Sequence, residues 1–311
     1  MPSINRTTVL KGPALVTYGG QSFWSKGDIT VTPVFERFPI PTSRFGVVTE
    51  RHSNRKFTIA FEPSGRFTAA LHAVMWAVAA KNPGDSLLGG SDAALVVHGR
   101  DGVKITFHNA AITSAPGMRL SANTTITGSM TFTAILKNST DPTNAAAYYT
   151  IASEAYPGDS GFAVADIITT PYLANWGSSP WADFVTDNGW EIGFDMSIRE
   201  EKADGIGTYD LVLEELKVTA KAAPVGPTMA QIMTALKTTE ALGTDLSGTD
   251  DLVIASTVVG GPSVTISRAA MVESGFQFGS QPKRVAPTTW TATRLITAGV
   301  AQPLFAVDVV A

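Results

Sequence analysis

The sequence predicts a mainly β protein built from two tandem units, each with one helix. Runs that alternate apolar and hydroxyl residues are frequent, whereas runs with helical spacing are few. The same succession of elements also occurs twice, about 159 residues apart. Residues 103–107 and 110–112 correspond in this way to 263–266 and 269–271. A duplicated β-rich unit indicates a part made for a symmetric assembly.

In the first unit, alternation predicts strands over 29–32 and 57–61, and two more over 103–107 and 126–135. A helix is predicted between the second and third strands because Phe67, Leu71, Val74 and Val78 recur at helical spacing and residues 82–84 form a terminator. In the second unit the helix is carried by Met229, Ile232, Met233 and Leu236, starting after Pro227. The order strand, strand, helix, strand, strand therefore repeats.

Length and composition fit two ordered units. The chain has 311 residues, 44% of them hydrophobic and 16% charged, with a net charge of −4. This composition excludes a disordered chain and a strongly basic nucleic-acid binder. The absence of cysteine excludes disulfides, thiolate metal sites and cysteine nucleophiles, and the four histidines leave little for a metal cluster. We therefore expect no cofactor and no metal.

The first residues lack the apolar segment of a signal peptide, and no run of about 20 apolar residues is present. We therefore expect a protein made in the cytosol that does not enter a membrane.

The expected domains are residues 1–140 and 188–311, joined by a linker over 141–187. Turn signals such as Asp141-Pro142 and Pro157-Gly158 mark this linker, and residues 162–165 are a candidate extra strand within it. Between the first two strands of each unit lies a polar, glycine-containing insertion, residues 39–54 and 199–210. Each insertion is interpreted as an extended hairpin loop that reaches a neighbouring subunit.

Three stretches carry a resemblance to a known family: residues 24–33, the loop 42–46, and the strand and helix over 57–78. With residues 188–192 taken as the second opening strand, nearly the whole chain resembles siphophage major tail tube proteins, specifically those with two fused tube domains. The resemblance implies β-sandwich or barrel domains with one flanking helix, whose strands join those of neighbours into a closed oligomeric β-barrel. It further implies trimeric rings with pseudo-sixfold symmetry, although the duplication itself also permits a ring of six.

The function implied by this resemblance is structural. The chain would polymerise into stacked rings that form the channel for DNA during phage genome delivery. Its partners would be its own copies, the tape measure protein and then genomic DNA in the lumen without sequence specificity, and tail terminator and baseplate proteins at the ends. It would be made in the host bacterial cytoplasm and reside in the virion, with no enzymatic activity. Whether the tail contracts is left open.

In such a tube the apolar face of each strand packs under the helix and the polar face lines the channel. Hydroxyls dominate the polar face, and a wall with few lysines would be hydrated without retaining phosphates. The alternative is that these residues form an ordinary solvent-facing side of an antiparallel sheet. The expected lumen-facing residues are Thr30, Thr32, Thr58, Lys104, Thr106, Thr127, Ser129, Thr131, Thr133, Glu191, Asp195, Ser197, Lys217, Thr219, Ser263, Thr265, Thr289, Thr291 and Thr293.

The two insertions are expected to make contacts between stacked rings, because insertions between sheet strands are free to project. The candidate residues are Arg44, Phe45, Glu50, Arg51, Arg199, Glu200, Glu201, Lys202 and Asp204. Trp176 and Trp181 are candidates for either a subunit contact or core packing.

Two alternative functions remain at this point. A baseplate hub or a tail terminator would share the domain but form a single ring. A chymotrypsin-like serine hydrolase is suggested by residues 158–161 around Ser160 and by His72, but an inserted Leu71 and the predicted helical position of His72 oppose it.

Overall fold

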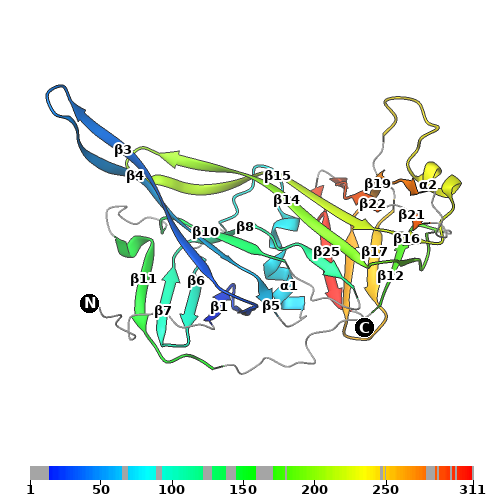
Figure 1. Ribbon diagram of the computed structural model, residues 1–311, viewed down its shortest axis with the longest axis horizontal. Helices are drawn as coiled ribbons and strands as arrows, with labels where there is room; N and C mark the ends of the chain where they lie inside the picture. The colour runs from blue at the N-terminus through cyan, green and yellow to red at the C-terminus, as the bar shows by residue number, and fades with distance from the viewer. Residues whose placement is uncertain are drawn as a thin grey trace.

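The protein is mainly β, as predicted. The structure is a computed structural model. It describes residues 14–64, 69–88, 93–121, 128–137, 145–158, 171–178, 181–245, 248, 250–277, 284–285, 287–294, 296–297 and 300–309. These residues form four larger antiparallel sheets, three two-stranded ones and two short α-helices (Figure 1).

The first half contains two sheets that pack face to face. Its elements are β1 (Ala14–Tyr18), β2 (Gln21–Ser25), β3 (Thr30–Thr42), β4 (Gly46–Phe61), β5 (Pro63–Ser64), α1 (Ala69–Met75), η1 (Ala77–Ala80), β6 (Leu95–Gly99), β7 (Val103–Phe107), β8 (Ala110–Ser114), β9 (Met118–Leu120), β10 (Met130–Ala134), η2 (Ala145–Ala147) and β11 (Tyr149–Ser153). Sheet A has the order β11-β7-β6-β1-β2-β5, and sheet B has the order β3-β4-β10-β8.

Aromatic side chains fill the space between sheets A and B. Tyr18 of sheet A meets Phe132 of sheet B edge-on with ring centroids 4.8 Å apart. Phe107 likewise contacts Phe57 at 5.5 Å. Because these rings come from the inward positions of alternating strands, the core follows directly from the period-two pattern of the sequence.

The second half repeats this arrangement. Its elements are β12 (Tyr172–Trp176), β13 (Val185–Thr186), β14 (Trp190–Ala203), β15 (Gly207–Ala222), β16 (Pro224–Val225), α2 (Met229–Ala235), β17 (Leu252–Ser256), β18 (Pro262–Ile266), β19 (Ala270–Glu273), β20 (Phe276–Gln277), β21 (Arg284–Val285), β22 (Thr288–Thr291), β23 (Ile296–Thr297), β24 (Val300–Ala301) and β25 (Phe305–Val309). Sheet D, β12-β17-β18-β25, matches the order β1-β6-β7-β11 of sheet A. Sheet C, β19-β22-β15-β14-β9, matches β8-β10-β4-β3 of sheet B and adds β9 from the first half.

Even the irregularities of the long hairpins recur. The β3–β4 pairing shifts register after Glu36 and after Ile40, and the β14–β15 pairing shifts after Ser197 and after Glu201, about 160 residues later in each case. In both hairpins the second strand begins at a glycine with a left-handed φ, 70° at Gly46 and 81° at Gly207. Each residue of one hairpin therefore has a defined counterpart in the other.

The structure corrects several sequence-based expectations. The polar faces of the four strands predicted for each unit do not form one surface, because β7 pairs with β6 and β11 in sheet A. The insertions 39–54 and 199–210 are continuations of the paired strands rather than loops. By contrast, the second helix begins after Pro227 as predicted, with Thr228 as the N-cap in a capping box with Gln231. The segment 141–187 contains β11, which pairs with β7, and β12, which pairs with β17; residues 162–165 lie outside the described residues.

The two halves are joined along a broad contact. β8 lies at the edge of sheet B, and β9, a few residues later, pairs with β14 at the edge of sheet C. Trp76, between α1 and η1, packs against Phe194 at 6.2 Å and Phe305 at 5.9 Å, both from the second half. One hydrophobic core consequently runs through both halves.

We predict that replacing Phe132 by alanine lowers the free energy of unfolding by about 3–5 kcal/mol, because this ring is fully buried. Phe45, which is 70% exposed, is the matched control, and Phe45→Ala should change stability by less than about 0.5 kcal/mol. Urea denaturation of dilute protein measures both values. Equal losses for the two variants would contradict this placement of the core.

Candidate assembly surfaces

Sheet B has one apolar and one hydroxyl-rich face. In register, Thr32, Thr58 and Thr133 form one row across β3, β4 and β10. Thr30 and Thr131 flank Ala60 in the next row on the same face, whereas Val31, Ile59 and Phe132 form the row between them on the core face. The two faces expected from the sequence therefore exist in this sheet, and Thr30, Thr32 and Ser129 are exposed.

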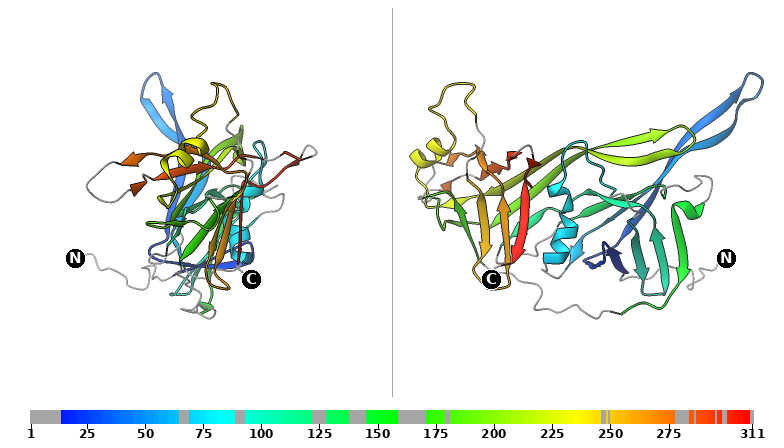
Figure 2. Two further views of the ribbon diagram at one scale, coloured as in Figure 1. Left: turned by 90° about the vertical axis from the view of Figure 1, so that its right-hand side faces the viewer. Right: turned by 180° about the vertical axis from the view of Figure 1, so that it is seen from behind.

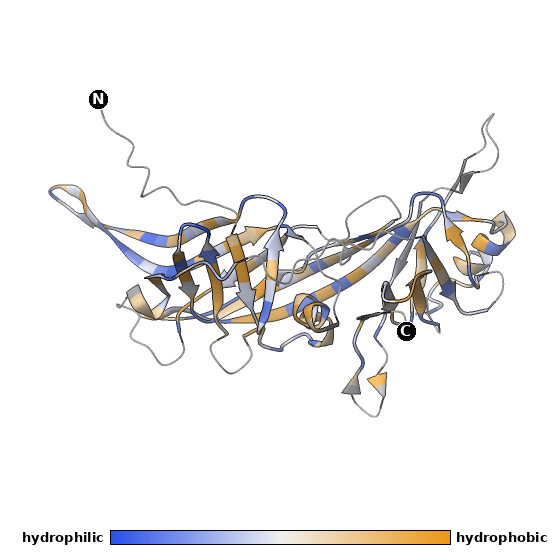
Figure 3. Cartoon of the chain, turned by 90° about the horizontal axis from the view of Figure 1, so that it is seen from below, coloured by the Kyte–Doolittle hydropathy of each residue, from blue (hydrophilic) through white to orange (hydrophobic). Residues whose placement is uncertain are grey.

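Sheet C has the same division with more charge. Its polar face carries the rows Glu191–Lys221–Thr289 and Gly193–Thr219–Thr291, followed by Asp195–Lys217 and Ser197–Glu215. Ile192, Ala220 and Trp290 form the core side. The alternation of hydrophilic and hydrophobic residues is visible along the long strands (Figure 3).

Other residues expected to face a lumen are placed differently. Lys104 and Thr106 lie on β7 in sheet A, and Ser263 and Thr265 lie on β18 in sheet D, so these four do not share the polar faces of sheets B and C. Thr133 and Thr289 are buried, with hydrogen bonds to Thr113 and Glu273. Thr293 follows β22 and donates a hydrogen bond to the carbonyl of Arg268. Thr127 lies outside the described residues.

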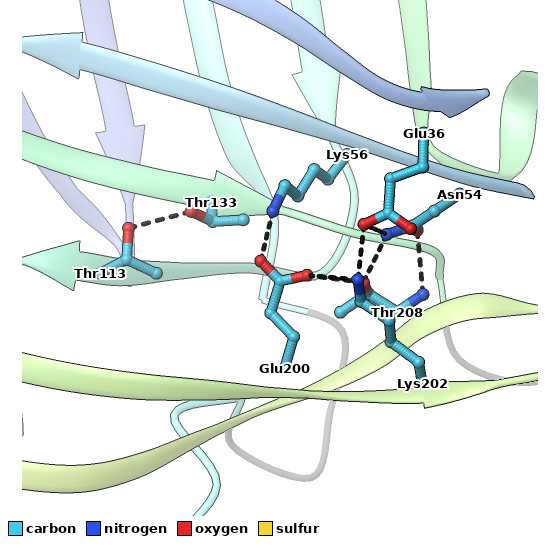
Figure 4. Close-up of polar contacts among 8 residues, drawn as sticks. All are labelled: Glu36, Asn54, Lys56, Thr113, Thr133, Glu200, Lys202 and Thr208. Atoms are coloured by element: carbon cyan, nitrogen blue, oxygen red, sulfur yellow. Dashed lines mark hydrogen bonds and ion pairs between the residues drawn. The ribbon is translucent and has the colours of Figure 1, made fainter.

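A cluster of polar side chains, here called the seam, joins the two long hairpins. It consists of Glu36, Asn54 and Lys56 from β3–β4 and Glu200, Lys202 and Thr208 from β14–β15 (Figure 4). Lys56 pairs with Glu200, and Lys202 pairs with Glu36.

Asn54 and Thr208 form the buried centre of the seam. The Asn54 Nδ2 donates to Thr208 Oγ1 at 2.8 Å, and the Thr208 backbone N–H donates to Asn54 Oδ1 at 3.0 Å. Thr208 Oγ1 in turn donates to Glu200 Oε2 at 3.0 Å. Because each buried polar group has a partner with a defined direction, this cluster fixes the register between the two hairpins.

The ionisation of the seam follows from these contacts. The hydrogen bond and charge of Lys202 hold the pKa of Glu36 below its usual value, and Glu36 raises the pKa of Lys202 in return. For Glu200, burial acts to raise the pKa, but the hydrogen bond and charge of Lys56, together with the Thr208 hydroxyl, outweigh it and the pKa is lowered. Glu36, Glu200 and Lys202 are therefore charged at neutral pH.

Beside the seam, the β14–β15 hairpin lies over the polar side of sheet B. A small apolar cluster of Leu88, Ala111, Ile135 and Leu211 fills the contact. Residues 84–87 also pair with β15 through the backbone, since the Gly84 N–H donates to the Leu213 carbonyl at 2.7 Å and the Leu87 N–H donates to the Leu211 carbonyl at 2.8 Å. The second hairpin is consequently covered by the first half along its outer edge.

The corresponding part of the first hairpin, residues 37–52, is here called the β3–β4 arm. It projects away from the rest of the chain (Figure 2). Its side chains are exposed except for the partly buried Ile40, and the exposed ones include Phe38 (44%), Val47 (59%) and Val48 (56%). A two-stranded extension that exposes several apolar side chains is unusual for a free surface.

The residues expected between stacked rings divide between these environments. Arg44, Phe45, Glu50 and Arg51 lie on the exposed arm. Glu200 and Lys202 are engaged within the chain in the seam. Arg199 pairs with Glu201 and Glu214 on its own hairpin, and Asp204 lies in the exposed turn. The seam pairs opposite charges that lie far apart in the sequence. The sequence alone does not indicate that these positions meet, so the seam was not predicted.

The remaining candidates have structural roles or lie outside the described residues. Burial lowers the pKa of His72 to about 4, so this helix residue is neutral at physiological pH, and Ser160 is not among the described residues. Trp176 and Trp181 pack against each other at 5.5 Å and against Trp290, which resolves the two alternatives in favour of core packing.

Among the described side chains, no group of three His, Asp or Glu has metal-binding geometry. No helix in the described part of the chain is long and apolar enough to span a bilayer.

No protein-family model matches the sequence, and no curated protein matches it.

We predict that Gly207→Ala destabilises the protein more than Gly46→Ala. Both changes place a side chain at a left-handed φ, which costs about 1 kcal/mol. A Cβ at position 207 would also lie 2.6 Å from Asn54 Oδ1, whereas one at position 46 would meet nothing within 4 Å. The expected losses are about 2–4 and 1 kcal/mol, measured by urea unfolding. Similar losses at both positions would exclude a contribution from the seam.

We also predict that acid weakens the contact between the halves. Because the pKa values of Glu36 and Glu200 are lowered on folding, their stabilisation is present above the unfolded value of 4.5 and is lost as the pH falls through the folded values. Glu200→Gln should reduce this acid-dependent loss and cost about 1 kcal/mol at pH 7. The matched control is Glu201→Gln, whose partner Arg199 is on the same exposed strand face. Unfolding free energies at pH 7 and pH 3 provide the comparison; an unchanged difference in Glu200→Gln would contradict the assignment.

Proposed function

We propose that this chain is a structural virion protein, the major tail tube subunit of a siphophage, in which each half is one tube domain. In this proposal its copies form trimeric rings that stack into a tube, and the polar sheet faces contribute to the wall of the channel through which DNA passes. The chain acts by assembly and performs no catalysis.

The observation that carries the proposal is the duplication of one sandwich-like unit within one chain. Both halves have the same strand order, the same bulges and the same long hairpin. The edge of sheet B continues through β8 and β9 into β14 of sheet C, so neighbouring units already join edge to edge once within the chain. Repetition of that junction between copies would cover the outer edges of sheets B and C in the described part of the chain, β3 and β19, which would otherwise pair unselectively.

The chemistry of the polar faces supports a passage for DNA. At the base of sheet B the polar face carries threonines, of which Thr30 and Thr32 are exposed, and sheet C has acidic residues such as Glu191 and Asp195 beside its lysines. A surface of this kind is hydrated but has little excess positive charge, so it would bind few phosphates and release few counterions. DNA would therefore move along it without strong attachment.

Electron microscopy of the purified protein tests the proposal. We expect long hollow cylinders of uniform width, whose end views have threefold symmetry with six similar lobes. Ser160→Ala is the matched control, because it should leave assembly unchanged.

Isolated rings that never stack would instead favour a baseplate hub or a tail terminator. A monomer under all concentrations and salts would contradict the proposal. So would hydrolysis of a generic ester or peptide that is lost in Ser160→Ala.

A further inference from the structure

We infer that the contact between copies repeats the contact between the two halves of the chain, and that it seats the β3–β4 arm on the second half of a neighbouring copy. The receiving patch is formed by Ser197, Glu215 and Lys217 on the polar side of the β14–β15 base. This inference rests on the proposed function, since it names the partner surface within the ring.

The intrachain contact provides the template. The outer part of the β14–β15 hairpin crosses the base of β3–β4 at the seam, and residues 84–87 pair with its outer edge. A hairpin of two strands is marginally stable on its own in water. The second hairpin therefore gains its stability from the neighbouring half.

The β3–β4 arm has the same backbone but no such cover. Within the chain, residues 84–87 are already paired with β15. The arm lies at one end of the molecule, whereas α2 and β19 of the second half lie at the other end (Figure 1, Figure 2). The base of its own β14–β15 hairpin therefore does not reach the arm, and only another copy presents the equivalent surface.

The shared register shifts define which residues would meet. Val47, opposite Pro41, occupies the position that Thr208 has opposite Lys202. Glu215, opposite Ser197, occupies the position that Asn54 has opposite Glu36. Since Asn54 and Thr208 are in direct contact, Val47 of one copy is expected to contact Glu215 of the next.

Exposed counterparts elsewhere on the molecule agree with this pairing. α1 packs against β25 of the second half, and Trp76 beside it is buried. The equivalent helix α2 leaves Met229 (55%) and Met233 exposed, and Ile151 is exposed on β11, the strand that corresponds to β25. The internal contact joins α1 to β25. The counterparts of these two elements, α2 and β11, both have exposed apolar residues and lie at opposite ends of the chain (Figure 1), which is the condition for head-to-tail assembly.

One consequence is a change of role for several residues. Ser197 and Lys217, expected on the channel wall, would instead be covered by the arm of a neighbour. The arm residues Arg44, Phe45, Glu50 and Arg51 would act within a ring rather than between stacked rings.

Cysteine cross-linking tests the pairing cleanly, because the native chain contains no cysteine. Val47→Cys with Glu215→Cys should give, after mild oxidation, a ladder of covalent dimers and larger species on a non-reducing gel. Asn54→Cys with Thr208→Cys should form the equivalent bond within one chain and remain at monomer mass. Val47→Cys with Lys221→Cys is the register control and should give no ladder, since position 221 lies six residues, about 20 Å, further along β15.

Assembly of each variant is followed in parallel by electron microscopy, which separates the two proposals. Rings or tubes with the Val47–Glu215 ladder support the inference. Two outcomes overturn this inference and leave the tube proposal standing. In the first, rings or tubes form and the internal pair cross-links, but the Val47–Glu215 pair does not. In the second, rings or tubes form and the register control cross-links as well as the Val47–Glu215 pair. Failure of the cysteine-free protein to assemble, with no ladder, overturns both.

Discussion

The rest of the structure depends on one constraint, which is that a long two-stranded hairpin needs another surface to hold it. Both hairpins of this chain extend well beyond the sheets in which they start. Strand pairing alone does not offset the loss of backbone entropy over such a length. The β14–β15 hairpin meets this requirement inside the chain through the seam and the apolar cluster around Leu211. The placement of the two halves follows from that contact.

The two equivalent hairpins carry different chemistry at matched positions. Where β14–β15 has Glu200, Lys202 and Thr208, the β3–β4 arm has Pro39, Pro41 and Val47. A contact within one chain loses no translational freedom, so a modest set of directional polar bonds is sufficient and also sets the register. A contact between copies must first offset the cost of association, for which apolar burial is the more effective contribution. The divergence of the two sequences therefore fits one internal and one external contact.

The sequence predicted what is local and periodic. The alternation in β4 and β10, the two helices and the spacing of the repeat could all be recognised because each depends on neighbours a few residues apart. The location of β7 in a different sheet was missed because residues 95–99 were not predicted as a strand, although β6 and β7 form a local hairpin; the other neighbour of β7, β11, lies about 40 residues later in the chain. The seam was inaccessible. Asn54 and Thr208 are 154 residues apart, and nothing in their local sequence links them.

For the same reason, the alternation of polar and apolar residues along a strand did not always predict which side chains are exposed. A polar residue on the outer face of a sheet is exposed only if no other element crosses that face. Thr133 has the alternation of an outward residue but is buried, because the second hairpin passes over sheet B near Ala111 and Ile135. In a chain whose units are arranged head to tail, each sheet face is shared between solvent and the hairpin of the next unit. The polar pattern therefore marks surfaces that are free in the isolated unit, including one that the other half covers in the whole chain.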